Sequence, residues 1–256
     1  MVLNAPRPTQ SLKVTWEALP DDYRLSEAPA QYVEQPMLAA ALTDALGEAG
    51  LIQPEMLIAS NFGLVATVNQ KVMVKAPDWL YVPRVLPWTG EGVRRSYTPI
   101  LQGDPVAIVM EFWSDEELGE YSIRPTFPYG NLFFYEQILQ VPTYATFDPY
   151  SQTLEVRQLR DGAYQLQEPS AEGRFWIPEL SLFLGVWYGP RLGSTIHWLR
   201  WWDSDGNLLL WSFEKAELER QRAEQEAQRA EAEKQRADAA EAELARLRSR
   251  LNPPHL

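Results

Sequence analysis

PVAIVMEFW, residues 105–113, is the stretch on which the fold depends, because it is apolar at nearly every position. A run of this kind is typical of a central strand that is buried on both faces of a sheet. The exception is Glu111, near the end of the run. A carboxylate there is costly unless it is hydrogen-bonded, paired or bound to a metal. The stretch therefore predicts the middle of a sheet and an acid that needs a partner.

The segments on both sides of this run predict the remainder of a mixed domain. A helix is expected at 37–50, where Leu38, Leu42 and Ala45 share one face, and another at 130–141. Helices interleaved with short strands predict an α/β or α+β fold. The expected strands are LVATV (64–68), KVMVK (71–75), WLYV (79–82), two within 144–159, and a hairpin through Asp161–Gly162.

Residues 174–213 hold six of the ten tryptophans. Alternating patterns predict strands in HWLRWW (197–202) and LLLWSF (208–213), linked by the turn SDGN. Tryptophans can stack on bases or sugars, but their place on strand-like segments favours core packing. The six are Trp176, Trp187, Trp198, Trp201, Trp202 and Trp211.

The charged C-terminal stretch, residues 214–251, predicts one long helix. QRAE or QRAD recurs every seven residues, and the two core positions of that repeat are both apolar only at its end, around Leu244, Leu247 and Leu251. Earlier turns place Glu219, Glu226 and Glu233 at one core position. Two interpretations remain open. The helix is a solvated tail, or its end forms a homodimer or binds a protein partner.

A ladder of alternating charge accounts for a helix that needs no packing. Opposite charges three or four residues apart contribute roughly 0.2–0.5 kcal/mol per pair to an isolated helix. The ladder comprises Lys215, Glu219, Arg222, Glu226, Arg229, Glu233 and Arg236.

Composition places limits on function. The chain has 256 residues, no cysteine and two histidines, which excludes thiolate chemistry and a histidine-rich metal site. Of the net charge of −12, only −1 falls on residues 214–251, so the rest of the chain is acidic. That argues against tight non-specific DNA binding. With no signal-like or membrane-spanning stretch in the sequence, we expect a soluble, cytoplasmic protein.

Asp78, at the start of the strand 79–82, and Glu111 are the candidate chemical pair. Two acids from neighbouring strands can share one Mg²⁺, which prefers oxygen ligands and keeps several waters. The structural alternatives are that Asp78 ends a turn after Pro77 and that Glu111 pairs with Arg124.

At this point the sequence resembles the Uma-two family of restriction endonucleases, which belongs to the PD-(D/E)XK nuclease superfamily and is abundant in cyanobacteria. The matching segments are APDWLYV, IVMEFWS, YEQILQVPTYATFDP and LEVRQLRDGAYQL, and the resemblance extends over about 16–211. It implies a restriction-endonuclease-like mixed sheet flanked by helices. The long charged helix also resembles tails on cyanobacterial members. The expected organisation is an extended segment (1–35), the nuclease-like domain (36–213) and the helix (214–251).

The resemblance implies that Asp78 and Glu111 bind the metal. The superfamily also uses a lysine, but two residues after the acid this chain has Trp113. In the family the lysine looks displaced to the next helix, four residues before its tyrosine, and Asn131 stands there. Asparagine carries no positive charge. Lys75 and Arg124 are the candidate substitutes, Glu34 is a candidate additional acid, and Asp148 is more typical of a turn residue than of a ligand.

Two functions follow. The first is a Mg²⁺-dependent DNA endonuclease that uses Asp78 and Glu111. The second is a non-catalytic nuclease-fold protein that acts as an interaction or scaffold module through its helix. The acidic pair and the family segments favour the first, whereas Asn131, the acidic domain and the self-sufficient helix favour the second.

Overall fold

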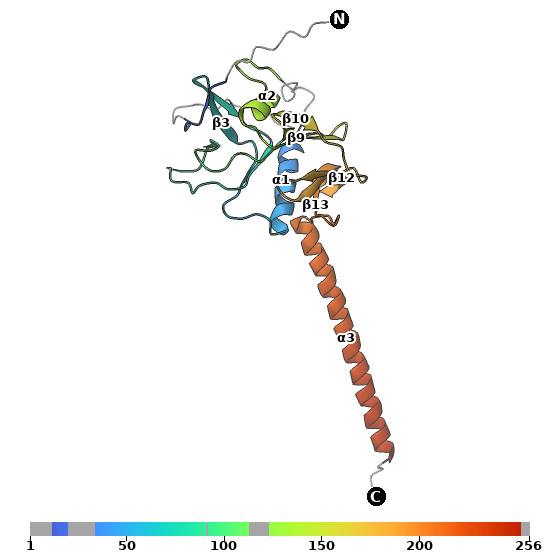
Figure 1. Cartoon of the computed structure of the whole chain (residues 1–256). Coiled ribbons are helices and arrows are strands. Elements are labelled where there is room, and N and C mark those ends of the chain that lie inside the picture. The colour runs from blue at the N-terminus through green and yellow to red at the C-terminus, as the bar shows by residue number, and fades with distance from the viewer. Residues whose placement is uncertain (1–11, 20–33, 91, 113–122, 252–256) are drawn as a thin grey trace. The chain divides into compact units, whose positions relative to one another are not determined.

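The computed structural model describes residues 12–19, 34–90, 92–112 and 123–251. The chain divides into two compact units, Met1–Leu209 and Leu210–Leu256, and each is described by itself (Figure 1). Most of the predicted extended segment 1–35 lies outside the described residues, as does Trp113.

The largest sheet of the first unit has six strands in the order β10-β9-β8-β7-β5-β2. β7 is Ile108–Phe112, and all five of its residues are buried, which confirms the central strand predicted from the apolar run. It runs parallel to β8 and antiparallel to β5, so the sheet is mixed as expected. The other strands are β2 (Leu57–Ala59), β5 (Trp79–Val82), β8 (Thr143–Asp148), β9 (Thr153–Arg160) and β10 (Ala163–Leu166).

Two smaller sheets complete this unit. One is built on the hairpin of β3 (Gly63–Val68) and β4 (Lys71–Lys75), which β1 (Val14–Thr15) and β6 (Ser96–Tyr97) extend. The other joins β11 (Phe175–Ile177), β12 (Leu182–Arg191) and β13 (Ser194–Trp202). On β13 the tryptophans Trp198, Trp201 and Trp202 are buried, whereas Trp176 on β11 is 39% exposed. The β13 tryptophans therefore pack in the core, as predicted.

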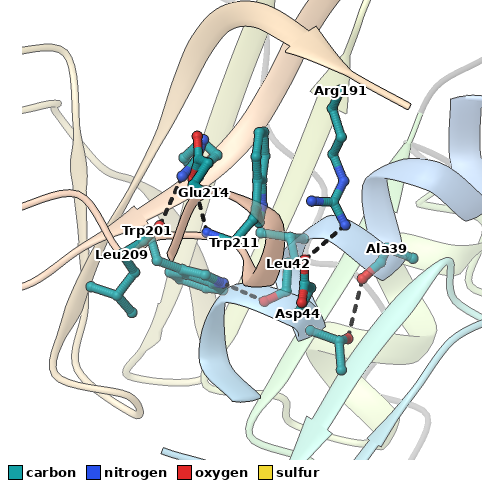
Figure 2. Close-up of polar contacts among 10 residues, drawn as sticks. Ala39, Leu42, Asp44, Arg191, Trp201, Leu209, Trp211 and Glu214 are labelled. Atoms are coloured by element: carbon teal, nitrogen blue, oxygen red, sulfur yellow. Dashed lines mark hydrogen bonds and ion pairs between the residues drawn. The ribbon is translucent and has the colours of Figure 1, made fainter. Parts of the chain in front are cut away.

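Helix α1 spans Glu34–Glu48 and begins three residues before the predicted start. It ends near Gly50, whose φ of 70° suits a glycine after a helix. Figure 2 shows two of its contacts with the third sheet. The indole Nε1 of Trp201 donates to the carbonyl of Leu42 over 3.2 Å, and Arg191 pairs with Asp44 over 2.9 Å.

Helix α1 is also tied to the six-stranded sheet. The indole Nε1 of Trp79, the first residue of β5, donates to Thr43 Oγ1 over 3.0 Å. Trp79 is fully buried. This contact fixes the start of β5, the point where Asp78 enters the sheet.

The helix predicted at 130–141 is present in a shorter and partly π-helical form. It begins as α2 (Asn131–Phe133) and continues as the π-helical turn η1 (Phe134–Ile138). π-Turns are rare and recur at functional sites. The buried side chains of η1 face the sheet, and the ring centroid of Tyr135 lies 5.4 Å from that of Tyr144 on β8.

The second unit contains α3, which spans Ser212–Leu251 and confirms the long helix (Figure 1). The strand predicted at 208–213 is wrong, because Leu208 forms one isolated bridge and Ser212 is already helical. Glu214 Oε2 accepts a 2.9 Å bond from the N–H of Trp211, three residues earlier, as in a capping box. This cap begins the helix where the alternating pattern predicted a strand.

Ion pairs formed on α3 include those of Arg220, which contacts Glu217 over 2.7 Å and Glu224 over 2.6 Å. These residues lie outside the predicted ladder but have the same three- and four-residue spacing. Within the part of the chain that the structure describes, no helix is both long and apolar enough to cross a membrane.

Candidate active site

Asp78 and Glu111 meet across two neighbouring strands. β5 and β7 are antiparallel with Trp79 opposite Met110, a register that sets Asp78 opposite Glu111. Asp78 is 9% exposed and Glu111 is 5% exposed. The two acids predicted from sequence are therefore adjacent and buried.

Each carboxylate is fixed by the backbone of the other strand. Asp78 Oδ2 accepts a 2.6 Å hydrogen bond from the N–H of Phe112, and Glu111 Oε2 accepts a 3.3 Å bond from the N–H of Asp78. These reciprocal bonds tie each acid to the strand segment that carries the other. Asp78 is thus bonded to the neighbouring strand β7 and does more than end a turn after Pro77.

Tyr135 holds the second oxygen of Glu111. Its hydroxyl donates to Glu111 Oε1 over 2.8 Å, and its side chain is fully buried. Burial and the negative charge of Glu111 raise the pKa of Tyr135 well above its ordinary value, so the phenol stays a donor. The resemblance included this tyrosine, but no sequence pattern indicated its contact with the acid.

Gln35 is a site residue that the sequence analysis missed. Its Nε2 donates to the carbonyl of Phe112 over 2.7 Å, and it is 6% exposed. Its neighbour Glu34, the candidate additional acid, is the first residue of α1 and is half-buried. Because the predicted helix began later, at Met37, neither residue was expected on it.

Lys75, the last residue of β4, lies close enough to Glu111 for their charges to interact. Burial lowers the pKa of Lys75 below its ordinary value, and the charge of Glu111 opposes that shift. Arg124, the other candidate cation, is exposed and donates from Nε to Thr126 Oγ1 over 3.2 Å. Of the two candidate substitutes, Lys75 is the one whose charge interacts with that of Glu111.

Asn131 is the first residue of α2, one helical turn before Tyr135, and is half-buried. It is therefore on the helical turn that continues into η1 and its tyrosine, but its amide is neutral. Asp148 is placed differently, as the last residue of β8, where the turn to β9 begins. Its Oδ1 accepts from the N–H of Tyr150 over 2.8 Å, and its Oδ2 accepts from Ser151 Oγ over 2.6 Å. These bonds show that Asp148 stabilises the turn that follows it.

The donor set of this site fits a hard divalent cation. Asp78 and Glu111 offer carboxylate oxygens, and Mg²⁺ is commonly held by one or two carboxylates with water completing its shell. Two carboxylates this close repel each other, and a bound cation would offset that repulsion. Among the described residues there is no cluster of three or more acidic, histidine or cysteine side chains. Among the residues that the structure describes, a metal here would rest on this pair.

A mixed sheet with paired acids at the ends of adjacent strands defines a restriction-endonuclease-like, nuclease-fold protein. The model of the Uma2 family, described as "Putative restriction endonuclease", matches residues 38–192, more than half of the chain. The chain therefore belongs to the Uma2 family. A search of curated proteins gave no match. The matched range includes both acids, Lys75, Asn131 and Tyr135, and ends before α3.

Proposed function

We propose that this protein is a divalent-metal-dependent DNA endonuclease whose metal is held by Asp78 and Glu111. The observation that carries the proposal is the reciprocal bonding of the two acids, with Phe112 N–H on Asp78 and Asp78 N–H on Glu111. Such bonding holds two buried carboxylates side by side before any ligand arrives. Preorganisation of this kind is what a hydrolytic metal site requires.

When bound, Mg²⁺ would activate water and stabilise the charge that develops on a phosphodiester oxygen. The protein residues have separate roles. Asp78 and Glu111 bind the cation, and Tyr135 fixes the orientation of Glu111 through its 2.8 Å bond. Lys75 would supply the positive charge that the superfamily's lysine provides, from the strand preceding Asp78. Its ammonium would orient the attacking water or contact a phosphate oxygen.

Gln35 keeps the edge of the site in place. By donating to the carbonyl of Phe112, it fixes the residue whose N–H contacts Asp78. A shift of Phe112 would thus move Asp78 away from Glu111. Gln35 is a positioning residue in this scheme.

The acidic character of the domain bears on the substrate. With a net charge of −11 outside residues 214–251, long-range attraction for DNA is weak. We therefore expect cleavage to be most evident with the divalent cation present, because the cation offsets the local negative charge.

The direct test is cleavage of supercoiled plasmid DNA with Mg²⁺ or Mn²⁺ by the wild-type protein and by Asp78→Asn and Glu111→Gln. A matched control is Glu179→Gln, since Glu179 is a partly buried carboxylate that accepts from Thr143 Oγ1 over 2.8 Å at the other end of β8. Cleavage that is lost in the first two variants and kept in the control supports the proposal. Cleavage that survives in Asp78→Asn contradicts it.

A second candidate is a non-catalytic nuclease-fold protein that works as an interaction module. The observation that favours it is the neutral Asn131 on the helix of Tyr135. In that case Mg²⁺ raises the melting temperature of the wild-type protein, but no DNA is cut. Cleavage that appears in Asn131→Lys would then identify a site that lost its activity together with its lysine.

A further inference from the structure

Two leucines near the end of α3 are exposed on one side of the helix. Leu244 is 53% exposed and Leu247 is 44% exposed, although both belong to a helix that is otherwise charged. They are three residues apart and follow Ala237 and Ala240 at the same two positions of the seven-residue repeat. Between 237 and 247 the repeat is apolar at both core positions, which is the pattern of a two-stranded coiled coil.

The charges beside these residues determine which partner fits. In a parallel pair of identical helices, the residue before each first core position faces the residue five places later on the partner. Arg236 would face Glu241 of the second copy, and Glu243 would face Arg248 of the second copy. Both are pairs of opposite charge. The apolar positions and the complementary charges therefore coincide in residues 236–248, which we name the pairing segment.

The preceding turns have the opposite character. There the second core position holds Glu226 and Glu233, and Arg229 would face Lys234 of the second copy, a pair of like charge. Buried glutamates and like-charged flanks both disfavour pairing. The earlier part of α3 therefore disfavours pairing with a second copy, whereas the pairing segment favours it.

We propose that the pairing segment joins two copies of this chain as a parallel, in-register coiled coil, while the part of α3 before it stays unpaired. This proposal does not depend on nuclease activity. Because only two repeats take part, the dimer is expected to be weak and its population to rise with protein concentration.

The absence of cysteine from the chain allows a direct test of register on the full-length protein. Ala240→Cys places a thiol at a core position, where the two copies of a parallel pair come within reach of a disulfide. Ala242→Cys, two residues later on the outer face, is the matched control. We expect rapid dimer formation by Ala240→Cys under mild oxidation and slow formation by Ala242→Cys. Equal rates would overturn the proposal, as would a wild-type protein that is monomeric in sedimentation at every concentration.

A second pair of variants tests the residues themselves. Leu244→Glu with Leu247→Glu should weaken dimerisation at least about tenfold, because apolar burial is replaced by repulsion. Glutamate is a good helix former, so circular dichroism should show unchanged helix content. Glu243→Lys should also weaken the dimer, and adding Arg248→Glu should restore it. A dimer unaffected by the leucine changes contradicts the proposal. So does a leucine-dependent dimer without the Ala240→Cys cross-link, since its helices are not parallel and in register.

Discussion

The hydroxyl of Tyr135 donates a 2.8 Å hydrogen bond to Glu111 Oε1, and it does so from a π-helical turn. An α-helical turn at this point would present a different set of side chains to the sheet, because a π-turn contains an extra residue. The bond connects η1 with the central strand β7. It makes Tyr135 the described residue through which helix geometry can control the orientation of the acid.

Tyr135→Phe is predicted to weaken metal binding and to destabilise the metal-free protein. The change leaves a buried carboxylate oxygen without its phenol donor, at a cost of about 1–3 kcal/mol. Denaturant titration would give the free energy of unfolding, and calorimetry with Mg²⁺ or Mn²⁺ would give the affinity. Tyr164→Phe is the matched control, because the Tyr164 hydroxyl donates over 2.9 Å to the carbonyl of Val141. If both variants lose the same metal affinity, Tyr135 has no particular role at the metal.

Lys75→Gln is predicted to lower the rate of DNA cleavage by at least about tenfold while metal affinity stays the same or rises. The change removes a positive charge that interacts with Glu111, and loss of one electrostatic contact to a transition state commonly costs a factor of 10²–10³. Lys75→Arg should recover part of the rate. Lys71→Gln, at the exposed start of the same strand, should leave the rate unchanged. A full rate in Lys75→Gln would remove Lys75 from the proposed mechanism.

The sequence predicted the central sheet and both acids because burial controls them. An apolar run such as 105–113 is stable only where it is buried, as in the middle of a sheet. Glu111 within it then needs a hydrogen-bond, ionic or metal partner. The hairpin at Asp161–Gly162 was also predictable, since both residues adopt positive φ, of 52° and 79°. Local chemistry and hydrophobic pattern lead to the same result at these positions.

The parts that could not be predicted depend on contacts between distant segments. Gln35 bonds to Phe112, 77 positions later, and no local pattern identifies such a partner. The start of α3 was mistaken for a strand because LLLWSF alternates, and its cap is Trp211, a residue type rarely found at that position. Only Glu214, three residues on, signalled the helix. From the sequence, Lys75 was one of two candidate cations. The fold brings it close enough to Glu111 for their charges to interact.

Gln35→Glu is predicted to destabilise the metal-free protein and to increase its dependence on metal. A carboxylate cannot donate to the carbonyl of Phe112, and it adds negative charge near Asp78 and Glu111. The free energy of unfolding of the metal-free protein should fall by about 1–3 kcal/mol at neutral pH. Addition of Mn²⁺ should raise the melting temperature of this variant by more than that of the wild type. Gln137→Glu, on the exposed side of η1, is the control. An equal Mn²⁺ response in all three proteins would place Gln35 outside the influence of the metal.

Asp148→Ala is predicted to reduce stability at neutral pH but to leave metal binding unchanged. Burial alone would raise the pKa of Asp148, but hydrogen bonds from Ser151 and from the N–H groups of Tyr150 and Ser151 lower it overall. A lowered pKa means that the folded state binds the proton less readily than the unfolded state. The stabilisation is therefore complete above the unfolded pKa, near about 4, and is lost as pH falls through the lower folded value.

Denaturant unfolding of wild type and Asp148→Ala at a series of pH values checks this prediction. At neutral pH the free energy of unfolding of Asp148→Ala should be lower than that of the wild type by about 1 kcal/mol, because exposed hydrogen bonds are lost. This difference should shrink once the pH falls below about 4, because protonated Asp148 no longer contributes its charge. Asp205→Ala provides a control in another exposed turn. A difference that stays constant with pH would mean that the ionised carboxylate is not what holds the turn. Loss of Mg²⁺ binding in Asp148→Ala would instead indicate that Asp148 is a metal ligand.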